Sequence, residues 1–254
     1  MKKISKKTTK ILLTLSVLAV AVIGLTMAYY SSQKEFENEF RIKEPGVAIY
    51  EKFNPTDWWV PGEEKSKQAW FANTGEMDML LRFSIEIKWA DGHAPSYKDK
   101  DGTIVPVNIQ AKDVVDLYWK DSKDKPNPLP LPTTLAEADA LAGFDFIPIT
   151  QNGVTYYYYK KVLKAKGTVG NDGADLSKTQ NVLESVKFHT NLSNDGHDNS
   201  DYSNTQIDLT IKGETVLADA AAVRDQWKES PNVQANINFE TGTVEWSMLP
   251  EITH

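Results

Sequence analysis

Apolar and polar side chains alternate along several stretches of the chain. The clearest case is residues 81–89, whose odd-numbered positions are all apolar and whose even-numbered positions are all polar. A period of two predicts a β-strand with one face in a core. A second long strand is expected over residues 207–215, where Gly213 interrupts the pattern and is interpreted as a β-bulge. Further strands are predicted at residues 46–53, 68–73, 105–109, 154–163 and 182–189.

Helical patterns are rare and short. Residues 134–141 begin with a capping-box pattern, and residues 219–227 offer one or two turns. Polar stretches predict long loops at residues 91–101, 120–132, 166–179 and 191–204. The chain has no regular succession of strand and helix. It is therefore predicted to be all-β: a jelly-roll-like β-sandwich with short helical insertions and long loops.

The first 28 residues have the organisation of a secretory signal peptide. A Lys-rich start is followed by an apolar run over residues 11–25, and then by small residues before a cleavage site between Ala28 and Tyr29. The apolar run is shorter than the roughly 20 residues that span a bilayer, although an uncleaved anchor is the alternative. We expect a signal peptide at 1–28, an N-terminal segment at 29–42 and one domain at 43–254. The protein is expected to be secreted to the extracellular matrix or cell surface.

Charge and composition narrow the function. Residues 1–28 hold five of the 28 basic residues and none of the 35 acidic ones, so the remaining 226 carry 23 basic and 35 acidic side chains, a net charge of −12. Such a chain repels phosphate, so nucleic acid is not an expected partner. The absence of Cys removes disulfides and thiolate metal sites. This combination is typical of an extracellular protein from a bacterium with a Gram-positive-type envelope.

No sequence motif indicates catalysis. HExxH, GxSxG, P-loop and GxGxxG patterns are absent, and the chain has four His. We predict no catalytic residue, no metal ligand and no cofactor. The Asp- and Asn-rich stretches at 99–102 and 194–201 could hold Ca²⁺, but polar turns are the preferred interpretation. Isopeptide bonds from Lys to Asn or Asp are left open.

Two groups of aromatic residues suggest carbohydrate binding as an alternative function. Residues 156–159 are four consecutive Tyr, and Trp58 and Trp59 are adjacent. Either group could bind a sugar. Strand alternation instead places one pair of the tyrosines in the core and the other on a solvated face. The tryptophans are interpreted as a cover of the core that anchors a loop.

Several stretches, in their order along the chain, resemble the TasA/camelysin family and within it the BsaA-type biofilm matrix branch. The boundary at 26–32 is similar to that of substrates of the SipW signal peptidase. The other similar stretches are WVPGE at 59–63, FANTG at 71–75, LRF at 81–83, YYYYKKVL at 156–163 and residues 213–227.

The resemblance implies a jelly-roll subunit of extracellular biofilm-matrix or surface fibres. In such fibres the mature N-terminus of one subunit adds as a strand to the next. The implied partners are other copies of the chain, a SipW-type signal peptidase and an accessory matrix protein. The segment 29–42 has a compatible strand pattern, with apolar residues among charged ones: Tyr29, Tyr30, Phe36, Phe40 and Ile42.

Three alternatives stay open at this point. The segment 29–42 could pair within its own domain. Relatives resembling camelysin imply a secreted metallopeptidase, and exposed Tyr or Trp would suit a carbohydrate-binding adhesive module.

Overall fold

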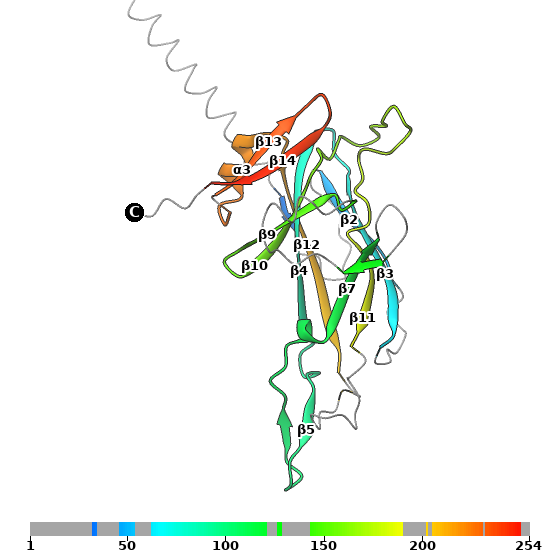
Figure 1. The fold of residues 1–254 in the computed structure, drawn as a ribbon, viewed down its shortest axis with the longest axis vertical. Helices are drawn as coiled ribbons and strands as arrows, with labels where there is room; N and C mark the ends of the chain where they lie inside the picture. The colour runs from blue at the N-terminus through cyan, green and yellow to red at the C-terminus, as the bar shows by residue number, and fades with distance from the viewer. Residues whose placement is uncertain are drawn as a thin grey trace, which may run out of the picture.

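The computed structural model describes residues 32–34, 46–53, 62–120, 126–128, 143–189, 202, 205–230 and 232–249. Within them, two five-stranded antiparallel sheets pack face to face (Figure 1). The first sheet contains, in spatial order, β1 (Ser32–Lys34), β12 (Ile207–Leu217), β4 (Met79–Trp89), β10 (Val154–Tyr159) and β9 (Phe146–Gln151). The second contains β2 (Val47–Lys52), β3 (Glu64–Asn73), β11 (Leu183–Phe188), β7 (Val115–Lys120) and β8 (Pro126–Pro128). The predicted all-β sandwich is confirmed.

The strand connectivity is that of a jelly roll. The chain visits β1, β3, β4, β7, β8, β10, β11 and β12 in turn, and these form the neighbours β1-β12-β4-β10 in one sheet and β3-β11-β7-β8 in the other. Two interlocked Greek keys give this order. Strands β2 and β9 extend the two sheets. The first strand of the jelly roll is therefore β1, at the N-terminal end of the described chain.

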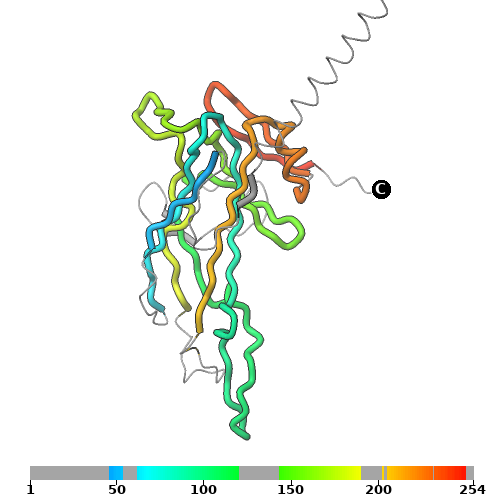
Figure 2. The backbone as a smooth tube through the Cα atoms, turned by 180° about the vertical axis from the view of Figure 1, so that it is seen from behind, coloured from blue at the N-terminus to red at the C-terminus, as the bar shows by residue number. Residues whose placement is uncertain are grey.

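A third layer covers the outer face of the first sheet. It consists of helix α3 (Ala220–Gln226) and the hairpin of β13 (Val233–Asn238) and β14 (Thr243–Met248) (Figure 1). The carboxylate of Asp219 caps α3 by accepting a hydrogen bond from the Ala221 N–H at 2.6 Å. A second hairpin, β5 (Ser96–Lys98) and β6 (Ile104–Pro106), projects from the opposite end of the molecule (Figure 2). A 3₁₀ turn, η1 (Ala111–Asp113), precedes β7.

The three layers enclose two cores. The main core lies between the sheets and includes Phe71, Phe83, Phe146 and Leu183. The second core lies between the first sheet and the third layer, and its residues include Leu80, Val216, Trp227 and Trp246. Because β4 is covered on both faces, its first six residues are all buried.

Most predicted elements match the structure, with some corrections. Strands appear at six of the seven predicted stretches at nearly the predicted bounds, and the helix expected at 219–227 is α3. At 105–109 there is only the short β6, and the strand expected to reach residue 163 ends at Tyr159. The loops expected at 91–101 and 120–132 contain the short strands β5 and β8. The hairpin β13–β14 and the strands β7 and β9 were not predicted. The helix expected at 134–141 and Trp58 and Trp59 lie outside the described residues.

The four tyrosines at 156–159 do not form a sugar platform. Tyr157 and Tyr159 lie in the main core and Tyr158 in the second core, while half-buried Tyr156 packs on Arg82 with 4.1 Å between ring centre and guanidinium carbon. The expectation of a solvated face was wrong, because α3 and the β13–β14 hairpin cover it.

Burial of two of these tyrosines predicts alkaline instability. Burial raises the pKa of the Tyr157 phenol to about 12, and it also raises the pKa of Tyr159. Unfolded tyrosine ionises near pH 10, so stability is complete below that pH and is lost as the pH rises toward 12. Between pH 8 and pH 11 we expect Tyr157 alone to lower the free energy of unfolding by about 1.4 kcal/mol. Urea titrations of wild type and Tyr157→Phe at both pH values measure this. An identical pH dependence in the two proteins would contradict it.

Gly213 does not mark a bulge, contrary to the prediction. The pairing of β12 with β4 runs without a register shift from Ile207 opposite Trp89 to Leu217 opposite Met79. A Cβ atom at Gly213 would lie 2.3 Å from Cε1 of Phe71 on the opposite sheet. Glycine is therefore needed at this position because an aromatic ring from β3 lies directly against the backbone of β12.

Candidate functional site

Among the described residues, strand β12 is paired along the whole of one edge and at three positions along the other. All eleven residues of β12 pair with β4. On the other edge, β1 contributes three residue pairs, Ser32 with Thr215, Gln33 with Glu214 and Lys34 with Gly213. No other described strand pairs with this edge. The N–H and C=O groups of an edge strand are a template for an added strand.

Apolar residues beside this edge are incompletely covered. Ile207 and Leu209 of β12 face the space between the sheets and are only partly buried. On the second sheet, β2 is likewise an edge strand, and Phe53 just beyond it is 37% exposed. The Lys67 ammonium lies 4.5 Å from the centre of the Phe53 ring and 3.0 Å from a carboxylate oxygen of Glu51. This margin of the core therefore contains an ion pair and a partly exposed aromatic ring.

A buried ion pair joins the segment of β12 that pairs with β1 to the neighbouring strand β4. Arg82 on β4 is completely buried, and its Nε donates to the Glu214 carboxylate at 2.6 Å. One terminal nitrogen of Arg82 also donates to Ser230 Oγ at 2.7 Å, which links β12 to the loop that follows α3. The rings of Tyr156 and Trp227 lie 4.1 and 4.6 Å from the guanidinium carbon.

The electrostatics of this cluster favour the charged state of Arg82. Burial by itself lowers the pKa of the guanidinium, but Tyr158 and Glu214 outweigh that effect and raise the pKa above its ordinary value. Arg82 therefore stays charged in the core. Replacing either Arg82 or its partner Glu214 with a neutral side chain leaves the other charge buried without its counter-ion and lowers the stability of the fold.

All six predicted site residues lie outside the described part of the chain. These are the cleavage-site residues Ala28 and Tyr29 and the donor-strand residues Tyr30, Phe36, Phe40 and Ile42. Residues 32–34, in the first half of the predicted donor segment, form β1, and in this single chain β1 pairs with its own β12. The pairing partner was not predicted from the sequence. Neither was the role of Arg82 and Glu214, because both occupy ordinary polar positions of alternating strands.

The described residues contain no group of three or more His, Asp or Glu side chains placed to hold a metal ion. In the stretch 99–102, one carboxylate oxygen of Asp99 accepts hydrogen bonds from the Asp101 and Thr103 N–H groups at 2.9 and 2.8 Å. That oxygen shapes the β5–β6 turn, as the preferred interpretation of the sequence had it.

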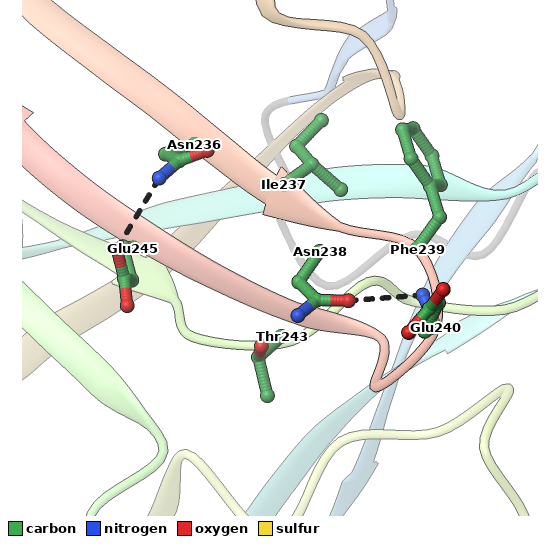
Figure 3. Close-up of a pocket in the computed structure, with 7 residues that line it drawn as sticks. All are labelled: Asn236, Ile237, Asn238, Phe239, Glu240, Thr243 and Glu245. Atoms are coloured by element: carbon green, nitrogen blue, oxygen red, sulfur yellow. Dashed lines mark hydrogen bonds between the residues drawn. The ribbon is translucent and has the colours of Figure 1, made fainter.

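A hollow lies beside the β13–β14 hairpin (Figure 3). Asn236 Nδ2 donates to Glu245 across the hairpin at 3.3 Å, and Asn238 Oδ1 accepts from the Glu240 N–H at 3.0 Å. These contacts hold the hairpin and its turn together. The residues that line the hollow are Asn236, Ile237, Asn238, Phe239, Glu240, Thr243 and Glu245.

Among the described residues, no helix combines the length and the apolar character needed to cross a membrane. When the chain is compared with models of known protein families and with curated proteins, neither comparison finds a match.

Proposed function

We propose that the protein is a secreted structural subunit of extracellular biofilm-matrix or surface fibres, in which the N-terminal strand of one chain pairs with the β12 edge of the next. The position of β1 carries this proposal. It is the first strand of the jelly roll, it follows shortly after the predicted cleavage site, and it forms three residue pairs with the eleven-residue strand β12.

The register of β1 gives the donated strand a defined fit. If the antiparallel pairing of Lys34 with Gly213 continues, Phe36 comes opposite Ile211 and Phe40 opposite Ile207. Directly opposed residues share a face of a sheet, so both phenylalanines would enter the space between the sheets. There they would cover the partly buried residues of β12 and Phe53. The predicted donor pattern thus matches the apolar pattern of the acceptor edge.

Charge supports the same register. The continued pairing brings Glu35 opposite Lys212, which already lies 3.4 Å from Glu86 on β4. Glu37 would come opposite uncharged Thr210. An opposed pair of unlike charges contributes roughly 0.2–1 kcal/mol, which is enough to prefer this register over a shift by two residues.

Such a contact propagates into a fibre. A neighbour's N-terminal strand can form the pairs that β1 forms within one chain, and each chain then has one donor and one acceptor. This head-to-tail contact does not close on itself, so subunits add without limit. The signal peptidase and the accessory matrix protein implied by the family resemblance belong to the same proposal, since cleavage after Ala28 frees the donor.

Removing the donor tests the proposal most directly. We expect the mature chain, residues 29–254, to form regular filaments in electron micrographs, and a chain of residues 43–254 to remain monomeric. Circular dichroism of the shorter chain checks that its sandwich persists. Equal filament formation by both chains would refute strand donation.

A charge exchange distinguishes donation between chains from pairing within one chain. We expect Glu35→Lys and Lys212→Glu each to raise the critical concentration for assembly severalfold, because each places like charges opposite one another. Glu37→Lys, opposite uncharged Thr210, is the matched control and should have a small effect. Mixing the two defective chains should restore filaments, because each donor then meets a complementary edge on the other chain. Mixing cannot repair a contact made within one chain, so a mixture as defective as its components would contradict the proposal.

A further inference from the structure

The outer face of the second sheet carries a stacked aromatic pair. Tyr50 on β2 is directly opposite Trp70 on β3, and the rings are nearly parallel with centres 5.7 Å apart. Tyr50 is 38% exposed and Trp70 is half-buried. The third layer of α3 and the β13–β14 hairpin lies over the other sheet (Figure 1). This aromatic pair therefore borders solvent, unlike the tyrosines at 156–159.

A fixed group of polar side chains lies next to the aromatic pair. Gln68 is one outward-facing position away from Trp70, a distance of about 7 Å along a strand. Its amide nitrogen donates to one oxygen of Glu184 at 2.9 Å, and the amide nitrogen of Asn181 donates to the other oxygen at 2.6 Å. Both amide groups are thereby held in one orientation, with their carbonyl oxygens set as acceptors.

We propose that this aromatic–amide face, formed by Tyr50, Trp70, Gln68, Asn181 and Glu184, binds a neutral polysaccharide. A pyranose ring has a face of C–H groups and a rim of hydroxyl groups. The aromatic pair supplies an apolar surface for the first, and the oriented amides of Gln68 and Asn181 supply hydrogen-bond acceptors for the second. The distance between neighbouring strands of a sheet is comparable to the length of one sugar unit.

Charge selects a neutral chain over an acidic one. The exported part of the protein carries a net charge of −12 and repels polyanions. Beside this face, the buried carboxylate of Glu184 is matched by amide donors, Lys178 is paired with Asp175 at 2.7 Å, and the exposed Lys52 is opposite Gln68. Hydroxyl-rich, uncharged ligands suit such a surface. The inference does not depend on fibre assembly, because the face lies on strands other than β1 and β12.

Isothermal titration of the mature chain, residues 29–254, tests this inference with cellohexaose and chitohexaose as neutral probes and a hyaluronate hexasaccharide as the acidic probe. We expect at least one neutral probe to bind and hyaluronate not to bind. Trp70→Ala should raise the Kd at least tenfold, and Gln68→Ala should raise it severalfold. Phe239→Ala is the matched control, because it removes an aromatic ring that is 62% exposed on the distant β13–β14 hairpin.

Each outcome bears on the proposal. Loss of binding in Trp70→Ala and Gln68→Ala, with thermal unfolding unchanged in Gln68→Ala, supports the site. Binding that survives in Trp70→Ala, or that is lost in Phe239→Ala, overturns it. So does the absence of binding to either neutral probe. A Trp70→Ala variant that binds sugar normally but fails to bundle its filaments would assign the face to contacts between copies of the chain instead.

Discussion

Gly213→Ala is expected to lower the free energy of unfolding by about 3 kcal/mol, at the upper end of the cost of overpacking a core. The added Cβ would lie 2.3 Å from Cε1 of Phe71, and that ring is completely buried among other aromatic side chains. Neither the ring nor the strand can move aside without disturbing the contact between the two sheets. Urea unfolding of wild type and variant at pH 7 measures the difference.

Two further variants make this result specific. Thr210→Ala changes the same strand at a half-buried position and should cost less than 1 kcal/mol. Phe71→Leu, introduced into Gly213→Ala, removes the clashing ring atoms and should recover part of the lost stability. A Gly213→Ala protein as stable as wild type would show that the ring does not occupy the space beside β12.

Glu214→Leu is expected to destabilise the fold by about 4 kcal/mol, the cost of leaving a buried charge without its partner. Arg82 would keep its charge inside the second core, between Tyr156 and Trp227, with the half-exposed carboxylate of Glu229 as its remaining ion-pair partner among the described residues. Arg82→Met should be costly for the complementary reason, since it leaves the Glu214 carboxylate buried.

The double variant tests the coupling between the two side chains. Combining Arg82→Met with Glu214→Leu removes both charges, and the hydroxyl groups of Tyr158 and Ser230 can still bond to each other across 3.0 Å. We therefore expect the double variant to be several kcal/mol more stable than the sum of the single effects implies. Strict additivity in urea unfolding would mean that the ion pair is not the reason for the single losses.

Alternation of side chains predicted six strands of the sandwich, each of which has one face in the main core, but it did not predict β7 and β9 of the same sheets. The alternation gave the wrong burial for polar positions of a strand that is covered on both faces. In β4 the polar position of Arg82 is as buried as its apolar neighbour Leu81. Its cover comes from α3 and the β13–β14 hairpin, which lie far along the chain. The hairpin itself was missed, although Val233, Ala235 and Ile237 alternate with polar residues.

The candidate site divides in the same way. The proposed donor segment follows from two local properties of the sequence, its apolar pattern and its position after the predicted cleavage site. The acceptor could not be predicted, because which strand lies at a sheet edge depends on topology. Gly213 illustrates the difference. Its glycine was visible in the sequence, but the reason for it is a ring on the other sheet.

The placement of β1 also has a consequence for the order of folding. Ser32 pairs with Thr215, so the first described strand has its partner near the other end of the described chain. A contact of such high contact order forms late, because a large loop must close before it forms. Throughout synthesis the N-terminal strand is thus available while its own acceptor does not yet exist. Where chains of such a fibre protein emerge close together, the β12 edges of molecules that have already folded would compete with the strand's own β12. The outcome depends on the effective concentration of each. The spacing of export sites would then decide whether a chain closes on itself or joins its neighbour.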